Sequence, residues 1–269
     1  MKLKIFFSFL VIILSQALPQ NLERIEPPFW WAGFKSDELQ LMVYGENISK
    51  LKPEIEGSEI IIEKVHKVDS PNYLFLDLKL NDNVPQTFEI QFFYKNEKVL
   101  YYDYELKKRE ASFYREKSLN PSDVIYLIMP DRFANGDKSN DEVDGLIEKS
   151  NRKSKDGRHG GDLQGIINNL NYIESMGFTH IWLNPVLENN QPDFSYHGYS
   201  TTDYYQVDKR LGSNALYKQL SKEAAKRGLG IVKDLVLNHI GSGHWWMDDL
   251  PTKDWLNHQD KYIQTNHVH

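Results

Sequence analysis

A nearly continuous run of apolar residues at 231–237 predicts a strand in the last part of the chain. The run contains Ile231, Val232, Leu235, Val236 and Leu237. This pattern is typical of a parallel strand that is covered on both faces. Asp234 lies inside the run, and Asn238 and His239 follow it. A buried carboxylate is costly unless it has a partner, so Asp234 is either a paired functional group or a satisfied structural aspartate.

Strands and helices alternate ahead of this run. Apolar runs at 124–129 and 178–183 predict two further strands, each followed by polar residues. Apolar residues at helical spacing predict helices over 163–176 and 213–227, and Gly177 and Gly228 follow them as C-caps. The order strand, helix, strand, helix, strand predicts parallel βαβ units over residues 122–269.

The N-terminal part of the chain has a different pattern. Apolar runs of strand length at 39–44, 73–80, 88–94 and 99–106 are separated by glycine, proline and asparagine. They predict an immunoglobulin-like β-sandwich over residues 18–110. Trp30 and Trp31 near its start favour packing against a neighbouring domain over stacking on a sugar. Residues 111–121 lack apolar periodicity and are interpreted as a linker.

Composition narrows the function classes. The chain has 269 residues, a net charge of −6 and no basic stripe with interleaved aromatics, which argues against nucleic acid as a partner. It contains no cysteine. Disulfides, iron–sulfur clusters, thiolate zinc sites and a cysteine nucleophile are therefore excluded.

The first residues predict export. Lys2 and Lys4 precede an apolar run over 5–14, and small residues follow at 15–17. This is the pattern of a cleaved signal peptide, 1–17, and the run is too short to cross a bilayer as a stable anchor. We expect a periplasmic or extracellular protein with no membrane span after cleavage.

Three motifs follow the three predicted strands in order. The first is the 129–137 loop, Met-Pro-Asp-Arg-Phe-Ala-Asn-Gly-Asp, together with His-Gly-Gly-Asp-Leu at 159–163. The second is Tyr-His-Gly-Tyr at 196–199 with Thr-Asp-Tyr-Tyr at 202–205 and Asp208, and the third is Asp234-x-x-x-Asn238-His239. With them the chain resembles the α-amylase family of glycoside hydrolases, in its neopullulanase and cyclomaltodextrinase branch. The resemblance implies a sandwich followed by about three units of a (β/α)8 barrel.

The resemblance also implies a sugar site. His197 and His239 match family histidines that hydrogen-bond the sugar before the scissile bond, and Asp234 would brace the site by pairing with a nearby cation. Tyr199 and Tyr126 are further candidates for stacking or hydroxyl contacts with the sugar, and core packing explains both nearly as well. The implied partner is an α-glucan or a maltooligosaccharide, and a homodimer is left open. The alternative for the two histidines is a structural role at strand ends.

A structural Ca²⁺ is the implied cofactor. Its candidate ligands are Asn135, Asp137, Asn140, Asp141, Gly160 and Asp162. Oxygen ligands with three carboxylates suit calcium better than zinc or copper. The alternative is an ordinary loop, because turns prefer the same residues. His244, His258, His267 and His269 have no fixed spacing, and an aromatic, polar loop explains them better than a metal site.

The family cleaves α-glucosidic bonds with retention, using an aspartate nucleophile and a glutamate acid/base that follow the fourth and fifth strands. No motif of this sequence matches those residues, so no catalytic residue is assigned. We expect the chain to be an N-terminal part of such an enzyme that does not hydrolyse starch by itself. A non-catalytic carbohydrate-binding protein and a transglycosylase of the same family are the alternatives.

Overall fold

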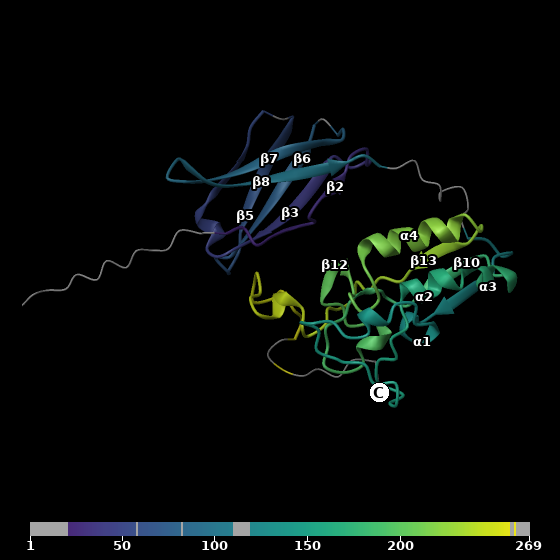
Figure 1. The fold of residues 1–269 in the computed structure, drawn as a ribbon. Helices are drawn as coiled ribbons and strands as arrows, with labels where there is room; N and C mark the ends of the chain where they lie inside the picture. The colour runs from purple at the N-terminus through teal and green to yellow at the C-terminus, as the bar shows by residue number, and fades with distance from the viewer. Residues whose placement is uncertain (1–20, 58, 82, 110–118, 259–260, 262–269) are drawn as a thin grey trace, which may run out of the picture. The chain divides into compact units, whose positions relative to one another are not determined.

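The computed structural model describes residues 21–57, 59–81, 83–109, 119–258 and 261. The predicted signal peptide, 1–17, lies outside these residues. The chain divides into two compact units: the first consists of Met1–Glu110 and Pro251–His269, and the second of Ala111–Leu250. Each unit has its own hydrophobic core and is described by itself (Figure 1).

The first unit consists of two four-stranded sheets. One sheet has the order β1 (Arg24–Glu26), β3 (Glu38–Tyr44), β6 (Tyr73–Leu80) and β5 (Ile60–Lys67). The other has the order β2 (Trp30–Trp31), β8 (Glu97–Lys107), β7 (Gln86–Tyr94) and β4 (Lys52–Ile55). Alternate residues of both sheets, such as Leu76, Leu78 and Ile90, enter one shared core. The predicted β-sandwich is confirmed.

The second unit contains a parallel three-stranded sheet. Its central strand, β10 (His180–Leu183), lies between β9 (Ile125–Ile128) and β13 (Gly230–Lys233). The helices that connect these strands are α2 (Leu163–Asn168), α3 (Leu170–Ser175) and α4 (Asn214–Ala225). In Figure 1, α4 runs alongside β13 and β10. The order of three parallel strands joined by helices is that of consecutive barrel units.

Smaller elements occupy the loops that follow the strands. They are α1 (Pro130–Phe133), η2 (Lys138–Asn140), β11 (Leu187–Glu188), η3 (Ser195–His197), β12 (Asp203–Val207) and η4 (Trp245–Met247). β11 and β12 form an antiparallel pair. These loops hold the predicted site residues of the second unit except Tyr126, which lies on β9.

The prediction of one helix over 163–176 was wrong. Two short helices, α2 and α3, meet at Asn169, whose φ of −110° and ψ of 12° leave the helical region. The Asn169 side-chain amide donates to the Gly165 carbonyl at 2.7 Å. A side chain that competes for a backbone acceptor in this way interrupts the regular helical hydrogen bonds.

The prediction of strands covered on both faces was also wrong for the described residues. Ile128, Ile181 and Leu183 point into the core with the helices, whereas Leu127 and Trp182 on the other face are 56% and 40% exposed. The strand predicted at 231–237 ends at Lys233, so Asp234 lies beyond it and is half-buried. Leu237 is 82% exposed, because the described part of the chain places nothing over it.

Candidate functional site

The loops that follow β10 and β13 supply the four predicted sugar-binding residues. Parallel strands bring their carboxyl ends to one edge of the sheet, and ligand sites of parallel α/β barrels form at that edge. His197 and Tyr199 come from the loop after β10, and Asp234 and His239 from the loop after β13. The structure brings all four together.

Tyr199 connects the other three residues. Its hydroxyl donates to Asp234 Oδ2 at 3.0 Å, and its carbonyl accepts from His239 Nε2 at 2.8 Å. Its backbone N–H donates to His197 Nδ1 at 2.9 Å. The Tyr199 side chain is 38% exposed, so part of the ring faces solvent at the centre of this group.

These hydrogen bonds set the proton positions of the two imidazoles. His197 Nδ1 accepts a hydrogen bond, so the neutral ring carries its proton on Nε2. Burial lowers the pKa of His197, and the charge of Glu148 opposes this shift only in part. A neutral His197 therefore offers an N–H donor at Nε2. His239 uses its own Nε2 proton to brace the backbone of Tyr199.

Asp234 differs from its prediction in one respect. We expected a cation beside it, but its polar partners in the described residues are the Tyr199 hydroxyl and Trp182 Nε1, at 3.0 and 3.3 Å. Both partners are neutral donors. Asp234 thus braces the Tyr199 ring without an ion pair.

The residues predicted to bind Ca²⁺ lie around the buried carboxylate of Asp162. Asp162 Oδ1 accepts from Gly136 N and Gly165 N, and Oδ2 accepts from Asp137 N at 2.8 Å. Asp162 is also the N-cap of α2. This one side chain therefore links the 135–141 loop to the helix that follows the 159–162 segment.

Two observations bear on whether these residues fit a cation. Asn135 Oδ1 and Asn140 Oδ1 are buried acceptors without a hydrogen-bond partner. Gly160, at a φ of +83°, lies so close to Asp141 that a Cβ atom would come within 2.4 Å of its Oδ1. The amide nitrogens of the same two residues donate to carboxylates, Asn135 Nδ2 to Asp141 Oδ1 at 2.6 Å and Asn140 Nδ2 to Asp162 Oδ2 at 3.4 Å. The unpartnered amide oxygens are hard donors of the kind that Ca²⁺ takes.

Other hydrogen bonds limit which of these residues can bind a cation. Asp137 Oδ1 accepts from the backbone N and the hydroxyl of Ser139, so this oxygen is already engaged. No group of three or more histidine and acidic side chains gathers as a metal site within the described residues. The residues therefore fit a cation held mainly by amide, carbonyl and single carboxylate oxygens.

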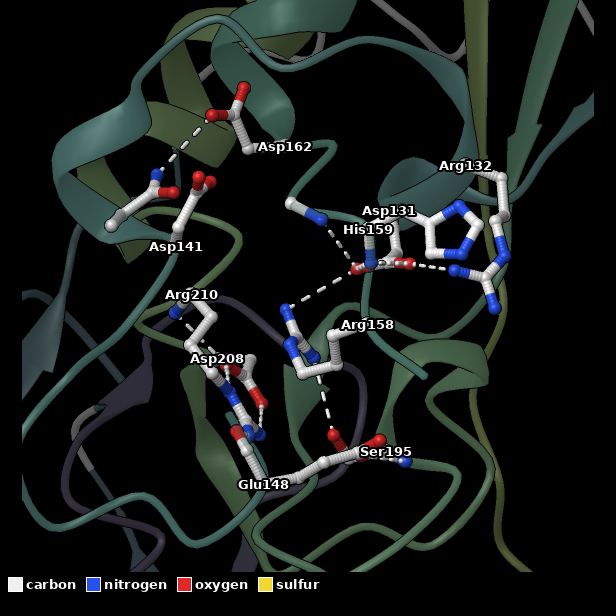
Figure 2. Close-up of polar contacts among 12 residues, drawn as sticks. Asp131, Arg132, Asp141, Glu148, Arg158, His159, Asp162, Ser195, Asp208 and Arg210 are labelled. Carbon is white, nitrogen blue, oxygen red and sulfur yellow. Dashed lines mark hydrogen bonds and ion pairs between the residues drawn. The ribbon is translucent and has the colours of Figure 1, made fainter. Parts of the chain in front are cut away.

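Sequence reasoning missed a largely buried network of ion pairs, which Asp131, Arg132, Arg158, Asp208 and Arg210 form (Figure 2). Arg210 donates to both oxygens of Asp208, at 2.9 and 2.7 Å. Arg132 pairs with Asp131 at 2.6 Å, and Arg158 Nη2 lies 3.8 Å from the same carboxylate. Arg158 and Arg210 are among the largest fully buried side chains of the described residues. Hydropathy places arginine at the surface, so only the Asp-x-Arg spacing at 208–210 was a usable signal.

Charge compensation shapes the pKa values within this network. Burial raises the pKa of Asp208, but the hydrogen bonds and charge of Arg210 outweigh burial, so the pKa lies below its usual value. Burial lowers the pKa of the Arg158 guanidinium, and the charges of Asp208 and Asp131 act against this shift.

The contacts of Tyr126 and His244 favour structural roles for both residues. The Tyr126 ring stacks on Phe178 at 4.6 Å and contacts Phe133, which supports core packing. His244 is buried, and its Nδ1 accepts from Trp246 N beside the rings of Trp245 and Trp246. His258 has a φ of 57° in the final described stretch, and His267 and His269 lie outside the described residues.

The family model for the alpha amylase catalytic domain matches residues 127–268, more than half of the chain. The chain belongs to the α-amylase family. A second model, that of the cyclomaltodextrinase N-terminal domain, matches residues 24–110. Relatives include neopullulanase 2 of Thermoactinomyces vulgaris, 37% identical over 51% of this chain and 24% of its own length. Both findings confirm the predicted neopullulanase-like branch.

Other relatives of this α-amylase family chain are also carbohydrate enzymes. The beta/alpha-amylase of Paenibacillus polymyxa is 46% identical over 44% of this chain and 10% of its own length. Alpha-amylase 2 of Dictyoglomus thermophilum is 31% identical over 74% of this chain and 30% of its own length. The chain therefore spans between a tenth and three tenths of these relatives.

Among solved structures, the alpha-amylase of Geobacillus thermoleovorans complexed with acarbose is similar to this chain. It is 39% identical, with a TM-score of 0.44, and the match covers 54% of this chain and 29% of that one. Within the described residues, no helix has the length and apolar character needed to cross a membrane.

Proposed function

We propose that this chain supplies the sugar-binding shell of an exported glycoside hydrolase that acts on α-glucosidic bonds of starch-derived glucans. The observation that carries the proposal is the meeting of His197, Tyr199, Asp234 and His239 at one edge of the parallel sheet. The relatives are named as neopullulanase and alpha-amylase, enzymes of the same substrate class.

His197 would donate from Nε2 to a sugar hydroxyl, and the partly exposed ring of Tyr199 would lie against the sugar face. His239 and Asp234 would hold Tyr199 in place, and a direct sugar contact of His239 remains a prediction. Cleavage with retention needs two carboxylates close together across the bond. The motifs of this sequence contain no such pair, so we expect binding without hydrolysis.

Calorimetric titration of the 269-residue chain with maltotriose tests this proposal, with cellotriose as the β-linked control. We expect saturable binding of maltotriose, weaker binding of cellotriose, and no reducing ends released from maltooligosaccharides. Equal affinity for both sugars would reject recognition of α-glucans. Release of reducing ends at an enzymatic rate would reject the assignment of binding alone.

We further propose that the predicted calcium-ligand residues bind a structural Ca²⁺ ion. The fit rests on the two unpartnered oxygens of Asn135 and Asn140 beside Asp141, Asp162 and Gly160. When bound, calcium would neutralise carboxylate charge and join the 135–141 loop to the 159–162 segment. The protein's own hydrogen bonds from Gly136 and Asp137 to Asp162 join the same two segments.

A ligand that binds only the folded state raises the melting temperature by mass action. Calcium added to chelator-treated protein should therefore raise it, by an increment that Asn140→Ala largely removes. Asp137→Ala should reduce the increment less, because Asp137 Oδ1 already bonds Ser139. Magnesium is the control ion. An equal increment in wild type and Asn140→Ala would contradict the site.

Export is the remaining part of the proposal, supported by the pattern of residues 1–17. N-terminal sequencing of the protein from the producing cell should find a mature chain that begins near Leu18. A protein that retains Met1 in the cytoplasm would contradict it.

A further inference from the structure

The turn that carries His197 has an unfavourable backbone. Phe194, which precedes η3, has a φ of 59°, and Gly198, which follows it, has a φ of 85°. Glycine adopts this region freely, but a bulky residue such as phenylalanine is disfavoured there. A strained conformation persists only where its surroundings hold it. The contacts around Ser195, the first residue of η3, provide that hold.

Three side chains hold the three polar groups of Ser195. Glu148 Oε2 accepts from Ser195 N at 2.7 Å, and Arg158 Nη1 donates to Ser195 Oγ at 3.3 Å. Asn189 Nδ2 donates to the Ser195 carbonyl at 3.3 Å. We refer to Glu148, Arg158 and Asn189 as the Ser195 clamp. Figure 2 shows Glu148 and Arg158 converging on Ser195.

The buried Asp208–Arg210 ion pair supports the Ser195 clamp through further hydrogen bonds. Arg210 donates to the carbonyls of both Glu148 and Asn189, at 3.0 and 2.9 Å. Asp208 Oδ2 accepts from Asn189 N at 3.1 Å. Two of the three clamp residues therefore share the Asp208–Arg210 pair as a support.

Energetics favour a positioning role for this arrangement. A buried ion pair contributes little net stability compared with apolar packing, because desolvation offsets the attraction between the charges. Hydrogen bonds to fixed, buried groups do restrict the conformations available to a turn. Ser195 is itself 3% exposed, so water cannot replace the clamp bonds without opening the turn.

We propose that the Ser195 clamp, through Glu148 above all, is a positioning device that holds His197 in the orientation that meets the sugar. The inference rests on the proposed sugar-binding role of His197 and names residues that act through it. Glu148 does not touch the sugar in this account. It fixes the backbone two residues ahead of the imidazole.

A pair of substitutions separates positioning from charge. Glu148→Gln and Glu148→Ala both remove the negative charge, but glutamine keeps an oxygen that accepts from Ser195 N. We expect Glu148→Ala to weaken maltotriose binding by about tenfold, as the loss of one part-buried hydrogen bond to a carboxylate does, and Glu148→Gln to stay within about twofold. Ser213→Ala, which removes the N-cap of α4 away from the turn, should leave the affinity unchanged.

A second measurement works without sugar. In Glu148→Ala, the amide of Ser195 should exchange with solvent faster and the imidazole signals of His197 should shift, while Glu148→Gln stays close to wild type in both. Unchanged exchange and unchanged His197 signals in Glu148→Ala would overturn the clamp. Equal loss of affinity in the two Glu148 variants would also overturn it, because charge or general stability would then be the cause.

His197→Ala distinguishes the two proposals. If this variant binds maltotriose like wild type, the sugar-binding role fails, and the exchange measurement still decides on the clamp. If it weakens binding while Glu148→Ala does not, the sugar-binding role stands and the clamp is rejected.

Discussion

At the scale of single residues, the second unit depends on charges that lie out of water. Arg210 is fully buried and satisfies its guanidinium with Asp208 and two backbone carbonyls. Such a pair adds little net stability, but removing one partner leaves a charge that neither water nor protein compensates. Asp208 is therefore the residue where a small chemical change should have a large effect.

Replacing Asp208 with asparagine should lower stability at neutral pH by about 3–5 kcal/mol, since Arg210 would lose its counter-charge. The folded-state pKa of Asp208 lies below its usual 3.8, so its contribution is complete above that value and is lost as the pH falls below it. Urea unfolding at pH 7 and below pH 4 should show a smaller acid-induced loss in Asp208→Asn than in wild type. Asp103→Asn, at an exposed site on β8, is the control, and an equal loss in both variants would contradict the pairing.

Functional residues could be predicted where they belong to a recognisable sequence motif. His197, Tyr199, Asp234 and His239 stand in ordered motifs after predicted strands, and the structure brings them together. Arg158 and the Ser195 clamp were not predictable. Their partners lie between 6 and 47 positions away, and no periodicity links such distant polar residues.

At the scale of elements, the two faces of the parallel sheet differ. Leu183 on β10 is 1% exposed in the helix-covered core, whereas Leu127 on neighbouring β9 is 56% exposed on the other face. The residues are chemically identical and lie in paired strands. Burial is therefore the main difference between the two sites, beside the central position of β10 and the edge position of β9.

Leu183→Ala should destabilise the second unit by about 2–5 kcal/mol, because it removes buried methyl groups and leaves a cavity. Leu127→Ala should cost less than about 1 kcal/mol in the same chain, since its side chain is already hydrated. Chemical unfolding followed by a probe in residues 119–250 compares the two. Similar losses would mean that another surface covers Leu127 in solution.

Element types were more predictable than element limits. Apolar runs identified β9, β10 and β13, but each strand is shorter than the apolar run that predicted it. A strand ends where its backbone hydrogen bonds to the neighbouring strand end, and apolar residues can continue beyond that point. The short strands β1, β2 and β4 escaped prediction because two to four residues carry too little pattern. The eight-residue strand β5 also escaped prediction, because charged residues follow its three isoleucines and break the apolar run. The break at Asn169 required a side-chain hydrogen bond that spacing does not reveal.

At the scale of the whole molecule, the change from alternating strands to βαβ order predicted the two-part plan. The change in hydrophobic periodicity along the chain marks the change from a core between two sheets to a core between helices and a sheet. Each unit has its own hydrophobic core. Sequence reasoning also predicted which edge of the parallel sheet holds the polar loops. It did not predict that the described residues cover one face of that sheet only.

The central claim is that His197 contributes directly to binding an α-linked sugar, and the affinity of His197→Ala for maltotriose tests it most directly. His66→Ala is the matched control, because His66 lies on β5 in the other unit and pairs with Asp77. We predict that the control binds like wild type and that His197→Ala binds about tenfold more weakly, the equivalent of about 1.4 kcal/mol. Equal affinities for wild type, His66→Ala and His197→Ala would contradict the account.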